Sequence, residues 1–426
     1  MVPPSGPIGP DLELAQHLFE ELLTLTGRAG GITRDSYGPG EQTAHVIAAT
    51  AAEAKGLEIR RDAAANLYIT LPGRDRAAPM LLMGSHLDSV PYGGNYDGAA
   101  GVVAGLATLA GLRRANLSPA VDLTVMAIRA EEAAWFDASY VGSRAAFGLL
   151  SAAEIDGIRR SDTGRTLAEH MTDCGADPVA LRRGEGFLTP DRLRCFIEVH
   201  IEQGPVLEQA GIPLGIVTGI RGCRRYRNAC CTGSYAHSGA EPRAHRRDAV
   251  AATVALIGRL EAEWIALEAG GHDLTFTVGE LYTDSAQHGP SKIAGETHFV
   301  LDFRSLSDEI MRHMCDRAEM LAAELGSAYR VTFDLGIPLL SAPGVLDANL
   351  RKHFAAAASA RGVAAIEMAS GAGHDASVFA NLGVPTGMIF VRNAHGSHNF
   401  EEAMDMRDFA AAAHVLFDVI SEGAVT

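Results

Sequence analysis

A histidine and two aspartates follow a run of four apolar residues at 80–83, which is typical of a buried strand. His86 and Asp88 come where such a strand should end, and Asp97 lies a short loop further on. A neutral imidazole and a carboxylate are natural ligands for zinc or a similar divalent ion, and an adjacent carboxylate can orient a ligating histidine. Asp97 offers two oxygens, which suits a carboxylate that bridges two ions. Taken alone, the segment is equally compatible with a surface loop that carries three polar residues.

Two more predicted strands lead into acids and a histidine. Residues 121–128 run into Glu131 and Glu132, and neighbouring side chains point in different directions, so one can bind a metal while the other faces the substrate. As a lone pair they are more typical of the acidic first turn of a helix. The strand that begins at Cys195 leads to His200. In open α/β sheets ligands bind at the carboxyl ends of strands, so we expect these side chains to converge. The potential metal ligands are His86, Asp97, Glu132, His200 and His398.

The chain is too long for one ordinary core, so two domains are expected from its 426 residues. The pattern changes near Gly222. From there, strands and long helices alternate in the order βαββαβ, which is one compact α/β sandwich, in segments 225–232, 246–268, 274–281, 297–304, 308–325 and 329–335. We therefore predict an α/β domain formed by residues 1–221 and 338–426, with residues 222–337 inserted into it. Within the larger domain, residues 98–106 are predicted to form a helix of small residues that packs closely against its neighbours.

Composition and charge exclude several classes of partner. The 36 basic and 52 acidic residues give a net charge of −16, which argues against nucleic acid or an anionic membrane as the main partner. The six cysteines form no CxxC pair and are typical of the reduced thiols of a cytosolic protein. The first seven residues lack the basic and apolar regions of a signal peptide, and no segment approaches the length of a membrane span. We predict a cytoplasmic protein.

Six short motifs, taken in order, make the sequence similar to a known family. They are GSHLDSVP at 84–91, AEE at 130–132, HIEQGPVLE at 200–208, AHSG at 236–239, GAGHDA at 371–376 and GSH at 396–398. The chain resembles the binuclear-metal M20 peptidase clan. Within it, the chain resembles the hydantoinase/carbamoylase branch of N-carbamoyl-L-amino acid hydrolases, β-ureidopropionases and allantoate amidohydrolases. The motif at His200 is the most specific, because peptidases of the clan usually carry an acid at that position.

This resemblance implies the fold and the metal site. The fold is an α/β, zinc-peptidase-like catalytic domain with an inserted βαββαβ dimerisation and lid domain. The five potential ligands hold two divalent ions per subunit, with Asp97 as the bridge. The ions are expected to be zinc, with manganese, cobalt or nickel as alternatives. The resemblance also predicts a cis peptide bond between Asp97 and Gly98.

The same resemblance implies a role for each further residue. Glu131 is the general base, Asp88 orients His86, and His237 reaches the site of a neighbouring subunit to stabilise the oxyanion. Gln203 contacts the carbamoyl group, and Arg304 binds the substrate carboxylate, for which its planar guanidinium is suited. The remaining substrate-binding residues are Ser291, Gly371 and His374. Ser291 and Ala236 stand where the family usually has asparagine, and both bear on which substrate fits.

The predicted function is a homodimeric amidohydrolase that cleaves the carbamoyl C–N bond of an N-carbamoyl-L-amino acid or a similar small anionic ureido acid. Three alternatives remain. The first is an allantoate amidohydrolase with the same machinery. The second is an aminoacylase or dipeptidase of the same clan acting on N-acyl amino acids, against which His200 argues. The third is a non-catalytic binding protein, against which Glu131 and the full ligand set argue.

Overall fold

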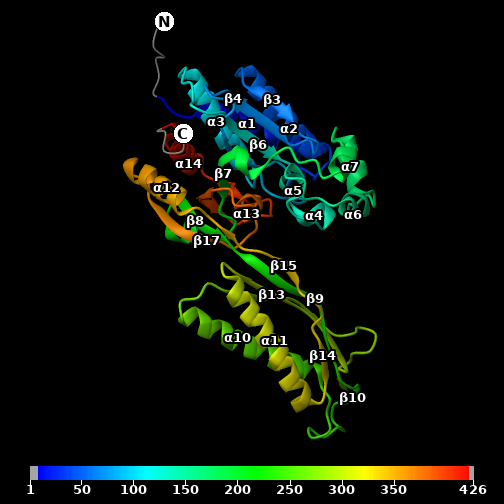
Figure 1. Cartoon of the computed structure of the whole chain (residues 1–426). Coiled ribbons are helices and arrows are strands. Elements are labelled where there is room, and N and C mark those ends of the chain that lie inside the picture. The colour runs from blue at the N-terminus through cyan, green and yellow to red at the C-terminus, as the bar shows by residue number, and fades with distance from the viewer. Residues whose placement is uncertain (1–7, 422–426) are drawn as a thin grey trace. The chain divides into compact units, whose positions relative to one another are not determined.

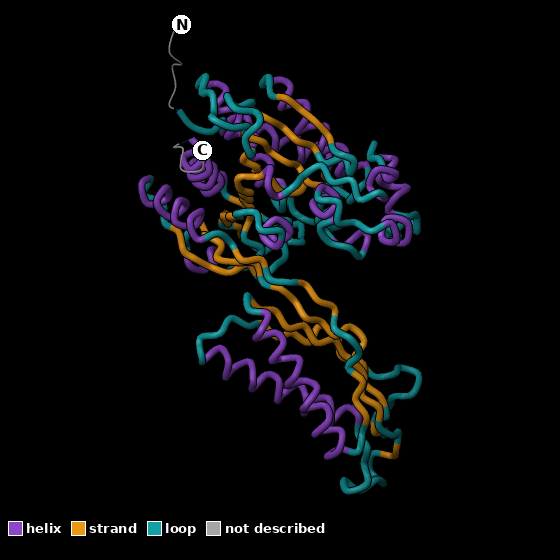
Figure 2. Tube along the Cα trace, viewed as in Figure 1, coloured by secondary structure: helices purple, strands orange, loops and turns teal. Residues whose placement is uncertain are grey.

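The computed structural model describes residues 8–421 and shows a chain of two compact units. The large unit comprises Met1–Thr218 and Val345–Thr426, and the inserted unit comprises Gly219–Gly344. The predicted insertion, 222–337, falls inside the second of these. Both units mix helices with strands, as Figure 2 shows, which confirms the predicted α/β class.

A nine-stranded mixed sheet forms the centre of the large unit (Figure 1). Its order is β16-β8-β18-β7-β5-β6-β4-β3, with β17 paired to β8. The four central strands β18, β7, β5 and β6 are parallel neighbours, so their carboxyl ends lie at the same edge. The strand bounds are Glu58–Arg61 (β3), Leu67–Leu71 (β4), Met80–His86 (β5), Leu123–Ile128 (β6), Leu193–Ile201 (β7), Leu214–Ile220 (β8), Gly344–Val345 (β16), Ala365–Ser370 (β17) and Thr386–Val391 (β18).

Helices cover both faces of this sheet. On one face, the apolar sides of five helices share a core with the strands: α1 (Leu12–Thr26), α2 (Pro39–Ala54), α3 (Ala99–Arg114), α12 (Ala348–Ala360) and α14 (Met406–Ser421). The even-numbered side chains of β7 point to the opposite face, where Phe196 stacks on Phe379 of α13 (Ala376–Asn381) with ring centroids 3.8 Å apart. Each face of the central strands is thereby buried, which explains their nearly continuous apolar sequences.

Helix α3 packs unusually close to the sheet, as its small residues predicted. A Cβ atom at Gly101 would lie 2.3 Å from the carbonyl oxygen of Val199 and 2.7 Å from the Cβ atom of Ser85. Only a residue without a side chain permits this approach. The close packing brings the loop before α3, which carries Asp97, next to the ends of β5 and β7.

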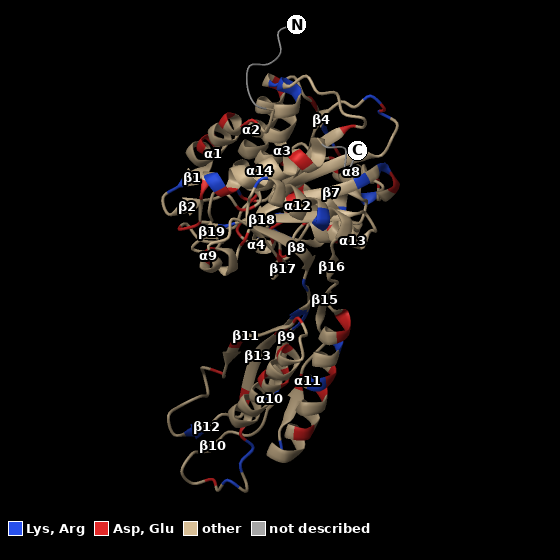
Figure 3. Ribbon diagram, turned by 90° about the vertical axis from the view of Figure 1, so that its left-hand side faces the viewer, with Lys and Arg blue, Asp and Glu red and all other residues tan. Residues whose placement is uncertain are grey.

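The inserted unit is a five-stranded sheet with two long helices on one face. The sheet order is β11-β13-β9-β14, with β15 also paired to β9, and the main elements follow the predicted βαββαβ order. Helix α11 packs Met314, Ala318 and Leu321 into a core with the sheet, while most of its charged residues, coloured along the helix in Figure 3, are exposed. The bounds are Gly222–Thr232 (β9), Ala236–His237 (β10), Ala249–Ala269 (α10), Thr275–Tyr282 (β11), Lys292–Ile293 (β12), Glu296–Ser305 (β13), Asp308–Tyr329 (α11), Thr332–Asp334 (β14) and Leu339–Ser341 (β15).

Several short elements were not predicted from the sequence. Besides the strands β8, β10, β12, β15 and β16 and the helix α13, whose bounds are given above, the missed elements lie mostly between β6 and β7. They are Ala133–Phe136 (α4), Val141–Ala146 (α5), Ala152–Gly157 (α6), Leu167–Asp173 (α7), Pro178–Arg182 (α8) and Val206–Ala210 (α9), with the 3-10 turn Pro190–Arg192 and the strands Gly27–Arg28 (β1), Gly31–Ile32 (β2), Asn393–Ala394 (β19) and Ala403–Met404 (β20).

Two sequence predictions concern features outside the sheets. No cis peptide bond occurs within residues 8–421, so the Asp97–Gly98 bond is trans and the predicted cis bond is wrong. In the same part of the chain, no helix is both long enough and apolar enough to cross a membrane. The first seven residues, for which the sequence predicts no signal peptide, lie outside the described residues.

Candidate active site

Three adjacent parallel strands supply most of the predicted site. His86 is the last residue of β5 and Asp88 follows in the next loop, while Glu131 and Glu132 lie between β6 and α4. His200 is the penultimate residue of β7. Because β6, β5 and β7 are neighbours in this order and run in the same direction, their polar ends meet at one edge of the sheet.

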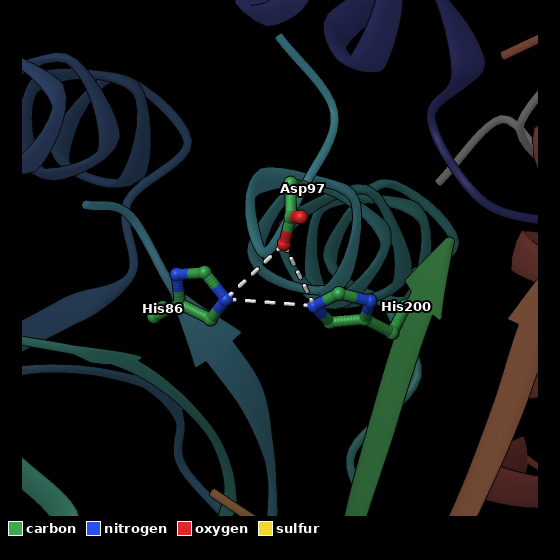
Figure 4. A group of neighbouring side chains, drawn as sticks. All are labelled: His86, Asp97 and His200. Carbon is green, nitrogen blue, oxygen red and sulfur yellow. Dashed lines mark hydrogen bonds and ion pairs between the residues drawn. The ribbon is translucent and has the colours of Figure 1, made fainter. Parts of the chain in front are cut away.

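One oxygen of Asp97 faces two histidines. The Nε2 atoms of His86 and His200 lie 3.5 Å and 3.2 Å from Asp97 Oδ1, and 3.4 Å from each other. Figure 4 shows both rings pointing toward the carboxylate from β5 and β7. All three side chains are almost fully buried. Three ligand atoms thus converge on one point.

The other oxygen of Asp97 faces a second group. His398, in the loop between β19 and β20, has its Nε2 atom 3.5 Å from Asp97 Oδ2 and 3.2 Å from Glu132 Oε1. The ligand atoms of Asp97, Glu132 and His398 all lie within 4.8 Å of one another, as do those of His86, Asp97 and His200. The two groups share Asp97, one through each of its oxygens.

The chemistry of these donors fits divalent cations. Asp97 Oδ1 is buried and faces the Nε2 atoms of His86 and His200 without a well-formed hydrogen bond to either, and a buried carboxylate oxygen in these surroundings is suited to a cation. The Nδ1 atom of His200 lies 2.9 Å from the carbonyl oxygen of Ile201, to which it donates, so the lone pair is on Nε2. Imidazole and carboxylate ligands in this proportion suit zinc, manganese, cobalt or nickel.

Asp88 connects three of the site residues. Its Oδ1 atom lies 3.4 Å from Nδ1 of His86 and accepts a 3.1 Å hydrogen bond from the amide of Glu131. Its Oδ2 atom accepts from the amide of Glu132 at 3.2 Å and from the hydroxyl of Ser36 at 2.6 Å. Asp88 therefore contacts the His86 ring, whose Nδ1 also lies 3.1 Å from the Asp88 carbonyl oxygen, and binds the backbone of both glutamates.

Burial and charge perturb the titration of the site. Burial, reinforced by the nearby Glu132 and Asp375 and opposed by His86, raises the pKa of Glu131 well above its ordinary value. Burial opposes protonation of His86, but hydrogen bonding to Asp88 and Asp97 outweighs it and raises the pKa of the imidazole. Cations bound beside Glu131 would favour its carboxylate form, which is the form that accepts a proton.

Two predicted substrate residues of the large unit adjoin the ligands. Gln203 Nε2 donates to Asp97 Oδ2 at 2.8 Å and lies 3.3 Å from Nε2 of His398. His374 packs edge-on against His200, with ring centroids 4.5 Å apart, and burial together with the His200 charge lowers its pKa well below the ordinary value. Gly371 belongs to the same loop between β17 and α13.

The other three predicted residues lie in the inserted unit. His237 and Ser291 are close, because His237 pairs with Lys292 across β10 and β12 and the Ser291 carbonyl accepts from the amide of Ser238. Arg304, on β13, donates to Asp302 Oδ2 at 3.2 Å. The predicted roles of these residues depend on how they meet the large unit, so they remain predictions.

Residues that support the ligands were missed from the sequence. Glu402 accepts from the amide of Tyr96 at 2.8 Å and from the hydroxyl of Ser397 at 2.6 Å, and so joins the loop of Asp97 to the loop of His398. Arg34, which is fully buried, donates to the carbonyls of Leu87 at 2.8 Å and Asp97 at 3.4 Å. The only sequence signal for Glu402 was its position four residues after His398. No sequence spacing indicated Arg34.

The fold and the motifs together define a family of hydrolases. The model of Peptidase family M20/M25/M40 matches residues 82–422, and the chain belongs to this family. It is 35% identical over 415 residues to the N-carbamoyl-L-amino acid amidohydrolase of Geobacillus stearothermophilus, covering 95% of this chain and 97% of that relative. It is 30% identical over 390 residues to the allantoate amidohydrolase of Escherichia coli strain K12, covering 91% and 92%.

A solved structure supports the same assignment. The crystal structure of an amidase of the hydantoinase/carbamoylase family from Burkholderia multivorans superimposes with a TM-score of 0.88 at 26% identity, covering 98% of this chain and 99% of that one. The family and branch predicted from the motifs are thereby confirmed.

Proposed function

We propose that this protein is a two-metal amidohydrolase that cleaves the ureido C–N bond of an N-carbamoyl-L-amino acid. The observation that carries this proposal is the arrangement of Asp97, whose two buried oxygens face two separate sets of ligands. The named relatives act on ureido compounds, which supports a small anionic ureido acid as the substrate. We infer that zinc occupies both positions, with manganese, cobalt or nickel as alternatives.

Side chains of the large unit have distinct roles in the proposed reaction. Divalent ions, when bound, polarise the ureido carbonyl and lower the pKa of water. Glu131, which is buried close to His86 and Glu132, takes the proton of the attacking water and returns it to the leaving nitrogen. The products are the amino acid and carbamate, and carbamate decomposes to carbon dioxide and ammonia. Gln203 offers its amide to the carbamoyl group.

We infer that the inserted unit completes the site in a homodimer as its dimerisation and lid domain. His237 Nδ1 accepts from the amides of Gly239 and Ala240, at 3.2 Å and 3.1 Å, so the proton of the neutral ring is on Nε2. That N–H is suited to stabilise an oxyanion in the site of a neighbouring subunit. Arg304 is suited to bind the substrate carboxylate.

Allantoate is a second candidate substrate. One of the relatives is named an allantoate amidohydrolase, and Ser291 is shorter than the asparagine usual at its position, which leaves room for a bulkier acid. A dipeptidase or aminoacylase is disfavoured, because His200 takes the position where peptidases of the clan usually carry an acid.

The test is ammonia release by chelator-stripped protein to which zinc, manganese, cobalt or nickel is restored. N-carbamoyl-L-amino acids and allantoate are compared by ammonia release, and N-acyl amino acids and dipeptides, whose hydrolysis yields no ammonia, by release of free amino groups. We expect metal-dependent release from N-carbamoyl-L-amino acids. Glu131→Gln should lower kcat by roughly 10²- to 10⁴-fold, the usual contribution of a general base, and keep its metal. Glu367→Gln, at an exposed glutamate of β17, is the control. Unchanged turnover in the Glu131 variant would refute the assigned chemistry.

A further inference from the structure

The turn between β6 and α4 has a strained conformation. Ala130 is buried and has a φ of +51°, in the left-handed region that non-glycine residues rarely adopt. Glu131 and Glu132 follow it directly. The backbone conformation of Ala130 therefore sets the positions of both glutamates. A contact from another part of the chain must stabilise this conformation.

Glu41, from the first turn of α2, supplies that restraint. Its Oε1 atom accepts a 2.8 Å hydrogen bond from the amide of Ala130. Its Oε2 atom accepts from the amide of Tyr37 at 2.8 Å and from Nη1 of Arg129 at 2.9 Å. Glu41 is completely buried, and both of its oxygens accept hydrogen bonds. Arg129 is itself held, because its Nη2 donates to Oε1 of Gln42 at 2.6 Å.

Two carboxylates accept the hydrogen bonds of the backbone amides in this turn. The amide of Ala130 donates to Glu41, whereas the amides of Glu131 and Glu132 donate to Asp88. Three successive N–H groups are thus bound by side chains from other parts of the chain. These hydrogen bonds fix the backbone of the turn, and the backbone sets the directions of the two glutamate side chains. Those directions therefore depend on Glu41 and Asp88, which touch neither metal nor substrate.

We propose that Glu41 is a positioning residue for the reaction, which holds the strained turn so that Glu131 faces the substrate while Glu132 faces the metals. This inference rests on the proposed function, in which Glu131 is the base. The rival explanation is that Glu41 and Arg129 form only a buried ion pair that stabilises the fold.

The variant Glu41→Gln separates the two explanations. It keeps the size of the side chain but replaces one acceptor oxygen with an amide. We expect kcat to fall by roughly 10- to 100-fold, since a misplacement of about 1 Å has an effect of this order, with KM changed by less than about threefold. Hydrogen exchange of a peptide covering residues 129–132 should quicken. Asp11→Asn is the control, because Asp11 is also buried and paired, with Lys55 at 2.9 Å, in a different part of the unit.

A second variant tests whether the strain at Ala130 is what Glu41 restrains. Glycine adopts a positive φ without strain, so Ala130→Gly added to Glu41→Gln should recover at least about threefold in kcat. A Glu41 variant with wild-type kcat and a lowered melting temperature would overturn the proposal, as would a double variant with no recovery. Hydrogen exchange needs no turnover, so the role of Glu41 is judged even if the wild-type protein fails to release ammonia from any ureido acid.

Discussion

Gly98 is the position where one added methyl group should disturb the metal site most directly. It precedes α3, has a φ of +66°, and its amide lies 3.2 Å from Nε2 of His200. A Cβ atom built there would lie 2.5 Å from Cε1 and Nδ1 of the His86 ring. The His86 ring cannot move without losing contacts, because Asp88 contacts one of its nitrogens and Asp97 faces the other. Gly98→Ala should therefore displace His86.

The size of the effect follows from two contributions. The positive φ costs an alanine at least about 1–2 kcal/mol, because at Gly98 it is combined with a ψ of −47°, and overpacking against a buried ring costs about 1–3 kcal/mol more. Gly362 is a matched control, because it has the same φ of +66° and nothing lies within 4 Å of the Cβ position. Gly362→Ala should carry only the first contribution. Because only Gly98 of these two glycines adjoins His86, a difference in metal affinity between the two variants reports the contact with that ring.

Two measurements test this prediction. Urea unfolding of the metal-free proteins should show Gly98→Ala destabilised beyond Gly362→Ala by about 1–3 kcal/mol. Competition with a chelator should show zinc affinity lowered by roughly 10- to 100-fold in the first variant, the usual effect of disturbing a ligand's support, and unchanged in the control. Equal zinc affinity in both variants would refute the geometry inferred for His86.

Two further predictions concern buried polar groups. Ser36→Ala removes a 2.6 Å hydrogen bond to Asp88 and should lower zinc affinity by about 10-fold; wild-type affinity would mean that the backbone amides alone hold this aspartate. Burial raises the pKa of Cys195 to about 12 and that of Cys174 to about 11, so both thiols stay protonated at pH 8. Cys195 is also buried, whereas Cys174 is partly exposed, so labelling of the native protein with a thiol reagent at pH 8 should spare Cys195 and reach it on unfolding; rapid native labelling of Cys195 would contradict its burial.

The site residues at the strand ends could be predicted because a strand and the polar residue that follows it can both be recognised within one short segment. A run of apolar residues followed by His86, Glu131 or His200 can be recognised without knowing which strands are neighbours. Two missed helices had a local signal as well. Ser151 with Glu154, and Thr166 with Glu169, have the spacing of a capping box, and both boxes form in the structure. These signals were overlooked rather than absent.

The supporting residues had no such signal. Glu41 acts on a backbone amide, and nothing in the residues near Ala130 indicates a positive φ or an acceptor on α2. Ser36 and Arg34 likewise bind groups that come close only after β5 and the loops around it have packed. Hydrogen bonds between distant segments leave no periodic pattern, because either partner can be any polar residue.

By itself, the sequence predicted the candidate site residues, the order in which the strands present them, and the position of the inserted segment. The tertiary structure alone decided that β6, β5 and β7 are neighbours, that Asp97 presents one oxygen to each group of ligands, and that buried acids hold the turn at Ala130. The physical reason is that composition and periodicity are properties of a segment. The distance between ligand atoms is a property of how segments pack.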